Sequence, residues 1–213
     1  RDRSVSRGLG DVYKRQAIGN LDEYWDYIEN HSCRMIGGCI WDWVDQSFRE
    51  VDAHGKWYWA YGGDYGPENI PSFGNFCCNG LVNAVREPHP HLKEVKKAYQ
   101  YIKCTLKDPK NLTIAIKNWY DFTNLNAYVL KWSIMGDNGK MLAKGEQSIE
   151  VAPHATTEVS LGGVRLPRNI REAYLNLSWT PKKKSAFIGT DDEVAYDQFV
   201  CLLYTSPSPR DTE

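Results

Sequence analysis

The stretch GGCIWDWVDQ, Gly37 to Gln46, decides how the first half of this chain folds. It ends a nearly continuous apolar run from Met35 to Val44, which is typical of a strand buried on both faces in a parallel sheet. A helix is predicted just before it, at 21–29, where apolar residues recur at helical spacing after a suitable N-cap, Asn20. A helix followed by a buried strand indicates an α/β fold.

The sequence pattern changes twice after this strand. Residues 45–88 are rich in Gly, Pro, Asn and aromatic residues without a clear period, which indicates a long ordered loop. Residues 89–102 carry one apolar stripe and predict an amphipathic helix. The remainder alternates with period two, as in an antiparallel sandwich, and we place a domain boundary near Lys103. The predicted strands are 112–119, 128–134, the segment after GDNG, 156–161, 173–179 and 193–200.

The composition is that of a globular protein and disfavours two classes of partner. The 213 residues carry a formal net charge of −1 without a long run of one sign, so neither nucleic acid nor an acidic membrane surface is expected as a partner. No apolar run approaches the roughly 20 residues that span a bilayer. The eight tryptophans are many, and flat rings suit both wide cores and the C–H faces of sugars.

The two ends are expected to be foreign to the natural protein. DVYKRQ, residues 11–16, can be encoded by DNA whose reverse complement encodes CLLYTS, residues 201–206. Unrelated protein segments would hardly show this relation by chance. We therefore expect residues 1–16 and 201–213 to be translated sequencing adapter and set them aside in reasoning about the fold. The remainder divides into 17–102 and 103–200.

The end of the predicted strand is a first candidate site. In a (β/α)₈ barrel the active site lies at the carboxyl ends of the strands, so Trp41 to Asp45 would border the pocket. Trp41 is suited to be a platform for a sugar ring, and Asp42 or Asp45 to bind hydroxyls or hold loops. The residues alone equally allow Trp41 and Trp43 to be core residues, with the aspartates capping the loop.

A second cluster follows in YWAYGGDYG, GNFCCNGLV and REPHPHL. Gly62 and Gly63 permit tight turns beside Asp64, and the Asn79 amide can both donate and accept hydrogen bonds. Phe76 can supply a carbonyl oxygen, the ligand type that hard cations favour. The residues alone leave open the alternatives of turn glycines, an Asx turn and a core phenylalanine.

These motifs, in this order, resemble one family. GGCIWDWVDQ, WAYGGDYG, NFCCNGLV and PHPHLKEVK are similar to the end of the catalytic barrel in the long beta-galactosidases of glycoside hydrolase family 2. LAKGEQSIEVAP is similar to the domain that follows. The resemblance covers residues 17–200. It implies an α/β plus all-β chain, with the incomplete terminal part of a TIM (β/α)₈ barrel followed by an immunoglobulin-like β-sandwich.

The resemblance implies a retaining hydrolase of terminal β-galactosides such as lactose, with two catalytic glutamates about 5 to 5.5 Å apart. The nucleophile is expected four positions before Ala17, where Tyr13 stands, and the acid/base glutamate further upstream. Neither glutamate, and none of the magnesium ligands that the family implies, is then expected in this chain. The chain by itself is predicted to be inactive.

Residue by residue, the resemblance assigns substrate contacts and a sodium site. Trp41 matches a tryptophan that lines the galactose subsite. Phe76 and Asn79 match a backbone oxygen and a side-chain amide associated with sodium, and Asn79 also lies near the sugar. The carboxylates expected only to hold neighbouring groups in place are Asp42, Asp45 and Asp64.

Other functions stay open. A carbohydrate-binding sandwich would use Trp119, Trp132 or Trp179 if their rings were exposed and coplanar, whereas a structural spacer would only hold other domains in place. A beta-glucuronidase or beta-mannosidase is less favoured, because the NFCCNGLV and PHP motifs resemble the galactosidase branch. The parent protein is expected to be a bacterial homo-oligomer, in either the cytoplasm or the periplasm.

Overall fold

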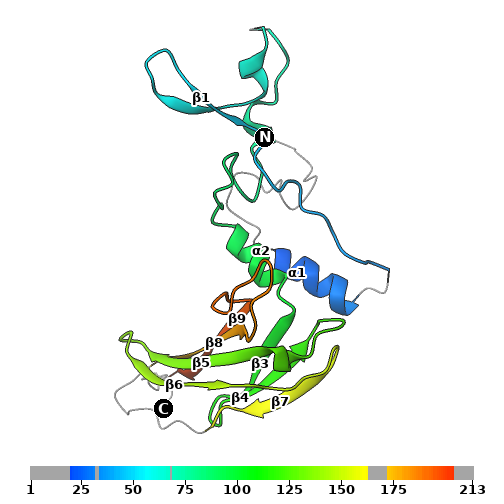
Figure 1. The fold of residues 1–213 in the computed structure, drawn as a ribbon, viewed down its shortest axis with the longest axis vertical. Coiled ribbons are helices and arrows are strands. Elements are labelled where there is room, and N and C mark those ends of the chain that lie inside the picture. Colours follow the sequence, from blue (N-terminus) through cyan, green and yellow to red (C-terminus); the bar gives the residue numbers. More distant parts are fainter. Residues whose placement is uncertain (1–19, 32–33, 68, 163–171, 204–213) are drawn as a thin grey trace, which may run out of the picture. The chain divides into compact units, whose positions relative to one another are not determined.

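The computed structural model describes residues 20–31, 34–67, 69–162 and 172–203 (Figure 1). They form two compact units, one ending at Tyr99 and the other beginning at Gln100. The segment 1–16, expected to be adapter, lies outside the described residues, as does 204–213. None of the helices in the described ranges has the length and hydropathy to cross a membrane.

Two helices organise the small core of the first unit. Helix α1 (Leu21–Asp26) continues into the π-helical turn η1 (Tyr27–His31), so the helix predicted at 21–29 is present. Helix α2 (Leu92–Ala98) is shorter than the predicted 89–102, because Ile102 instead begins a strand. The buried side chains that these helices share with the segment before α2 are Leu21, Leu81, Val95 and Ala98.

The buried strand predicted at 35–44 is not formed, and this prediction was wrong. Ile36 is fully exposed, and Trp41 and Trp43 are 62% and 58% exposed. The described residues contain one isolated parallel bridge here, between Val44 and Val82. A buried parallel strand needs hydrogen-bonded neighbours and covering helices on both faces, which the described part of this unit does not supply.

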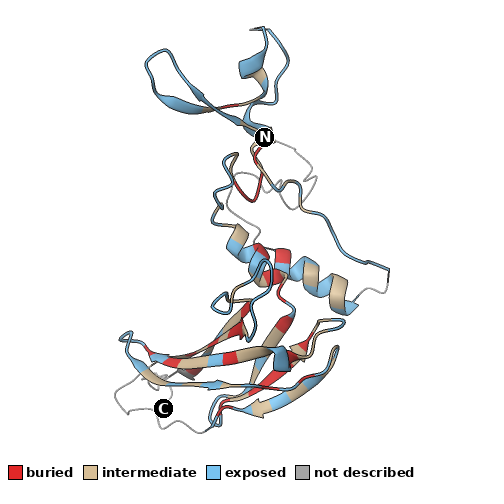
Figure 2. Ribbon diagram, viewed as in Figure 1, coloured by how far each residue is buried: buried red, intermediate tan, exposed pale blue. Residues whose placement is uncertain are grey.

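A β-hairpin lies within the region predicted as a loop. Strands β1 (Phe48–Val51) and β2 (Trp57–Ala60) pair antiparallel, and most of their residues are exposed (Figure 2). The Asp52 carboxylate accepts hydrogen bonds from the backbone N–H groups of His54 and Lys56, both at 2.9 Å, and so closes the turn. The 3₁₀ turns η2 (Gly62–Tyr65) and η3 (Gly74–Cys77) follow.

The second unit is a sandwich of two antiparallel sheets. One sheet has the strand order β3-β4-β7 and the other the order β6-β5-β8-β9. Every strand predicted for this region is present, and β3 is an addition. A 3₁₀ turn, η4 (Leu125–Ala127), precedes β5. The strands are β3 (Ile102–Asp108), β4 (Thr113–Asn118), β5 (Tyr128–Gly136), β6 (Met141–Gln147), β7 (Thr156–Ser160), β8 (Glu172–Pro181) and β9 (Ala195–Leu203).

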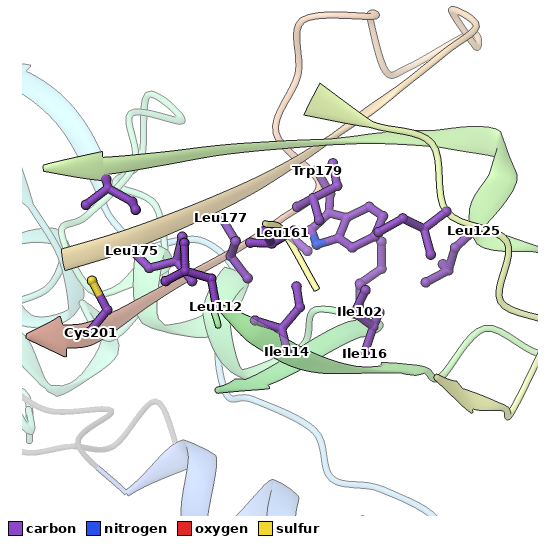
Figure 3. Close-up of a cluster of buried hydrophobic side chains, with 14 of the residues drawn as sticks. Ile102, Leu112, Ile114, Ile116, Leu125, Leu161, Leu175, Leu177, Trp179 and Cys201 are labelled. Atoms are coloured by element: carbon purple, nitrogen blue, oxygen red, sulfur yellow. The ribbon is translucent and has the colours of Figure 1, made fainter. Parts of the chain in front are cut away.

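The sandwich core lies between the facing sides of the two sheets (Figure 3). The predicted alternation holds, since Ile114 and Ile116 of β4 and Leu130 and Ile134 of β5 are fully buried. Asn118 is buried as well, but its amide donates to the carbonyl oxygens of Thr123 and Val151 at 2.9 and 3.0 Å. Its oxygen accepts from the Tyr120 N–H at 2.9 Å, so this polar group does not weaken the core.

Gly145 lies opposite Trp132 in the ladder between β5 and β6. A Cβ atom at position 145 would lie 2.6 Å from the Trp132 ring. Only glycine leaves room for this indole, which packs against the core from a half-buried position. The close contact therefore fixes where the tryptophan ring lies.

Strand β9 runs beyond Val200, the expected end of the natural sequence. Leu203 pairs with Glu172, and Cys201 is buried with its thiol donating to the Ala173 carbonyl oxygen at 3.3 Å. Residues 201–203, assigned above to the adapter, thus continue the ladder.

Candidate functional site

Residues 42–46 and 77–82 of the first unit lie side by side and join the two clusters that the sequence singled out. Gly80, in the second segment, is buried against the first, and a Cβ atom there would lie only 2.2 Å from the Asp45 nitrogen, so only glycine fits. Four backbone hydrogen bonds join the segments. The Leu81 N–H donates to the Asp42 oxygen at 3.1 Å, and the Val82 N–H to the Trp43 oxygen at 3.0 Å. In the other direction, the Asp45 N–H donates to the Val82 oxygen at 2.9 Å, and the Gln46 N–H to the Cys77 oxygen at 3.0 Å.

Trp41, the predicted sugar platform, begins this paired segment. Its ring is exposed, and the peptide bond between Trp41 and Asp42 is cis. The Asp42 carboxylate accepts hydrogen bonds from the Trp43 backbone N–H at 2.5 Å and from the Gln46 amide at 2.8 Å. Asp42 thus orders its own loop, and Trp41 presents its indole to solvent.

Asn79 lies directly opposite the start of this segment. Its backbone oxygen accepts a long hydrogen bond from the Asp42 N–H, at 3.5 Å. Its side-chain oxygen Oδ1 is buried and has no hydrogen-bond partner among the described residues. A buried amide oxygen without a partner fits a missing donor or cation, because an unpaired buried polar atom costs about 1–3 kcal/mol.

Phe76, the other residue of the predicted sodium pair, lies in η3, three positions before Asn79. Its ring is half exposed. The structure thus places Phe76 and Asn79 on one loop. Neutral oxygens of the kind that this loop supplies are suitable ligands for a hard cation.

Asp45 is the most constrained of the three carboxylates. It is 8% exposed, and its Oδ1 accepts the Gly80 N–H at 2.7 Å. Its Oδ2 lies 2.8 Å from Nε2 of His89. His91 stacks on His89 with ring centroids 5.4 Å apart, and its own Nε2 lies 3.1 Å from the Gly80 carbonyl oxygen.

Asp64 has a different and local role in this structure. Its carboxylate accepts the Tyr61 N–H at 2.8 Å and so caps η2. The paired segments therefore bring four of the predicted site residues together, whereas Asp64 only caps the 3₁₀ turn in which it lies. The four residues are Trp41, Asp42, Asp45 and Asn79.

Burial changes the acid–base properties of two groups beside Gly80. It raises the pKa of the Cys78 thiol to about 11, with the neighbouring Cys77 and Asp45 adding to the effect, so this thiol stays protonated at neutral pH. Burial also lowers the pKa of His91, although its hydrogen bond to the Gly80 carbonyl opposes the shift. A neutral His91 that donates from Nε2 leaves its buried Nδ1 without a partner among the described residues.

Sequence reasoning missed the roles of Gly80, His89 and His91. The PHPH motif carried a usable signal, because two histidines at alternate positions before a helix can lie on the same side of the chain. Nothing in the sequence indicated that His89 would contact the Asp45 carboxylate and His91 the Gly80 carbonyl oxygen, since that depends on how residues 42–46 pair with 77–82.

Comparisons with known proteins bear on both units. The family model "Glycosyl hydrolases family 2, TIM barrel domain" matches residues 13–104, and "Beta-galactosidase, domain 4" matches residues 114–201. The two matches follow each other in the expected order. The chain belongs to glycoside hydrolase family 2. The first match covers the paired segments described above, and the second covers most of the sandwich.

Curated relatives of this family 2 chain include beta-galactosidases from several bacteria. A beta-galactosidase of Priestia megaterium is 40% identical over 186 residues, which is 86% of this chain and 18% of the relative. One from Klebsiella pneumoniae is 35% identical over 184 residues, 86% of this chain and 17% of the relative. The chain thus spans less than a fifth of the length of these relatives.

Among solved structures, the match with an exo-chitosanase of Amycolatopsis orientalis covers 58% of this chain and 14% of the chitosanase chain. The sequence identity is 10% and the TM-score 0.38, so this likeness is too weak to bear on the fold.

Proposed function

We propose that this chain forms part of a beta-galactosidase that releases terminal β-galactose from β-galactosides by a retaining mechanism. The observation that carries the proposal is the alignment with beta-galactosidases across both units, at 40% identity over 186 residues for the Priestia megaterium protein. In this proposal the chain supplies one wall of the sugar site, and glutamates outside the matched segment supply the chemistry.

Within this proposal the first unit is the last part of a TIM barrel and the second is an immunoglobulin-like sandwich. The strand orders β3-β4-β7 and β6-β5-β8-β9 support the second assignment. They are the orders A-B-E and D-C-F-G, in which the fourth strand pairs with the third instead of the fifth. The barrel assignment rests on the family match and on Val44 pairing parallel with Val82.

Trp41 and Asn79 are the proposed substrate contacts, and Phe76 with Asn79 the proposed sodium ligands. The exposed indole of Trp41 suits stacking on a sugar ring, and the buried Asn79 Oδ1 without a partner suits a sodium ion or a sugar hydroxyl. Bound sodium would supply positive charge that holds a sugar oxygen and orders this loop. No residue of the described chain is assigned to magnesium, whose ligands are expected elsewhere in the parent protein, as is its homo-oligomeric contact.

A carbohydrate-binding role for the sandwich has little support. Trp179 is fully buried, and Trp132 packs on the core over Gly145. The Lys117 ammonium lies 3.7 Å from the Trp119 ring centroid and occupies one of its faces. No pair of these rings offers an exposed coplanar platform. We propose a spacer role for the sandwich.

A chimera tests the proposal. Residues 17–200 would replace the matching segment of the Priestia megaterium beta-galactosidase, and hydrolysis of the p-nitrophenyl β-galactoside, β-glucuronide and β-mannoside would be compared. We expect turnover of the galactoside alone, and none by the isolated chain.

Trp41→Ala should lower kcat/KM by about 10- to 100-fold, because the variant would lose the contact in which a bound sugar covers one large ring. Trp57→Ala, on the exposed hairpin, is the matched control and should change little.

Two outcomes would contradict the proposal. A folded chimera that prefers the glucuronide or mannoside would assign the segment to another branch of the family. A folded chimera that hydrolyses none of the three would remove the hydrolase assignment for this segment.

A further inference from the structure

Both backbone polar groups of Gly80, its N–H and its carbonyl oxygen, contact side chains from other parts of the first unit; we refer to these two groups together as the Gly80 peptide. The Asp45 carboxylate accepts its N–H at 2.7 Å, and Nε2 of His91 lies 3.1 Å from its carbonyl oxygen. His89 lies 2.8 Å from the second carboxylate oxygen of Asp45. We call this set the Gly80 clamp, consisting of Asp45, His89 and His91 around Gly80.

The clamp is costly to build, which indicates that its geometry matters. Asp45 is a carboxylate at 8% exposure, and a buried charge is tolerated only when it is paired and hydrogen-bonded. Gly80 admits no side chain, since a Cβ atom would lie 2.2 Å from the Asp45 nitrogen and 2.7 Å from the Val82 oxygen. The peptide is therefore fixed by both sterics and hydrogen bonds.

Both proposed sugar contacts lie next to the clamp. Asn79 directly precedes Gly80, and its backbone oxygen bonds to the Asp42 N–H. Trp41 directly precedes Asp42. A shift of the Gly80 peptide would thus move Asn79 and, through the Asp42 hydrogen bond, the segment that carries Trp41.

We propose that Asp45, His89 and His91 are positioning residues that set Asn79 and Trp41 for sodium and sugar binding by clamping the Gly80 peptide. This inference rests on the proposed function, specifies which group Asp45 holds in place, and adds His89 and His91, to which the family resemblance gave no role. Asp45 orients the N–H end, His89 orders the Asp45 carboxylate, and His91 holds the carbonyl end.

The test uses three variants of the chimera. Asp45→Ala removes the clamp, and Asp45→Asn is the conservative rescue, because an amide can still accept the Gly80 N–H and donate to the His89 ring. Asp52→Asn is the matched control, since Asp52 also accepts two backbone N–H groups but only closes the exposed hairpin. KM, kcat and the sodium concentration for half-maximal activity would be measured for each.

We expect Asp45→Ala to raise KM and the sodium concentration for half-maximal activity, with a total loss in kcat/KM of about 100-fold, the effect of misplacing binding groups by about 1 Å. Asp45→Asn should recover most of this loss, and Asp52→Asn should match the unmodified chimera. A residue with a merely structural role would lower the melting temperature without changing the sodium dependence.

A second readout does not need activity. Hydrogen exchange followed by mass spectrometry on the chimera would report how much sodium is needed to protect the peptides spanning residues 74–82. Asp45→Ala should need several-fold more sodium than Asp52→Asn. If the unmodified chimera is inactive, the proposed function fails, and this titration still decides on the clamp. Unchanged KM, sodium dependence and protection in a folded Asp45→Ala chimera would overturn the inference.

Discussion

The two units of this chain differ in whether they can cover their own apolar side chains. In the sandwich, side chains such as Ile116 of β4, Leu130 of β5 and Trp179 of β8 are fully buried between two sheets formed by the same unit (Figure 3). In the first unit, Ile36, Trp41, Trp43 and Phe73 are all more than half exposed. A sandwich finds partners for every strand within one stretch of sequence, whereas in the barrel that we propose for the first unit a strand would need neighbouring strands that the described residues do not supply.

Separating the units should have the largest effect. We expect residues 100–203 to give a monodisperse protein that unfolds cooperatively, and residues 17–106 to aggregate, because large exposed apolar surfaces associate. Size-exclusion chromatography and thermal unfolding monitored by circular dichroism would measure both. A monodisperse 17–106 fragment with a cooperative transition would show that the contrast between the units is wrong.

A core substitution should come next in size. Trp179→Ala in the 100–203 fragment should lower the free energy of unfolding by about 3–5 kcal/mol, because it empties a fully buried site. Trp179→Phe should cost less than its lost volume suggests, since it removes an indole N–H that has no partner among the described residues. Urea denaturation would measure the changes, with Phe122→Ala as the control.

Phe122 is 96% exposed, so its replacement should change the free energy of unfolding by no more than about 0.5 kcal/mol. Equal losses for Phe122→Ala and Trp179→Ala would contradict the packing described for the sandwich.

The smallest expected effect is a pH dependence confined to the first unit. Burial lowers the pKa of His91 below its ordinary value of 6.5, so the unfolded chain binds a proton more readily than the folded one. The stability from neutral His91 is present above about pH 6.5 and is lost as the pH falls through the lowered value. The groups beside it are His89, Asp45 and the Gly80 carbonyl.

The melting temperature of the chimera at pH 7.5 and 5.5 would measure this effect. His91→Gln keeps a donor for the Gly80 carbonyl without a titrating group, so its melting temperature should fall less between the two pH values. An identical fall in both proteins would show that His91 does not contribute to the pH dependence.

The same difference between the units explains how much the sequence could predict. Alternation in segments such as LTIAIKNW and AYLNLSW locates strands correctly, because their partners lie within the sandwich. The apolar run from Met35 to Val44 has equally strong character, but among the described residues it pairs only at its end, where Val44 forms an isolated bridge with Val82, so its pattern did not predict its conformation. The β1–β2 hairpin was missed although Asp52 and Gly55 carry a turn signal.

The candidate site was predictable only as a set of residue types. Motif resemblance singled out Trp41, Asn79 and Asp45, and the structure adds that Asp45 reaches Gly80 and His89. The contact between Asp45 and His89 joins positions 44 residues apart in the chain, and no local pattern encodes such a distance. The assigned roles of Trp41, Phe76 and Asn79 stay predictions until the chimera is measured.

The contact between Gly145 and Trp132 also limits how this sequence can change over time. The glycine and the indole share one volume across the ladder, so a side chain gained at position 145 has to be balanced by a smaller one at position 132. The two positions are therefore expected to be inherited as a pair. Descendants of this sandwich that lose the glycine first would pass through a less stable intermediate before the tryptophan could follow.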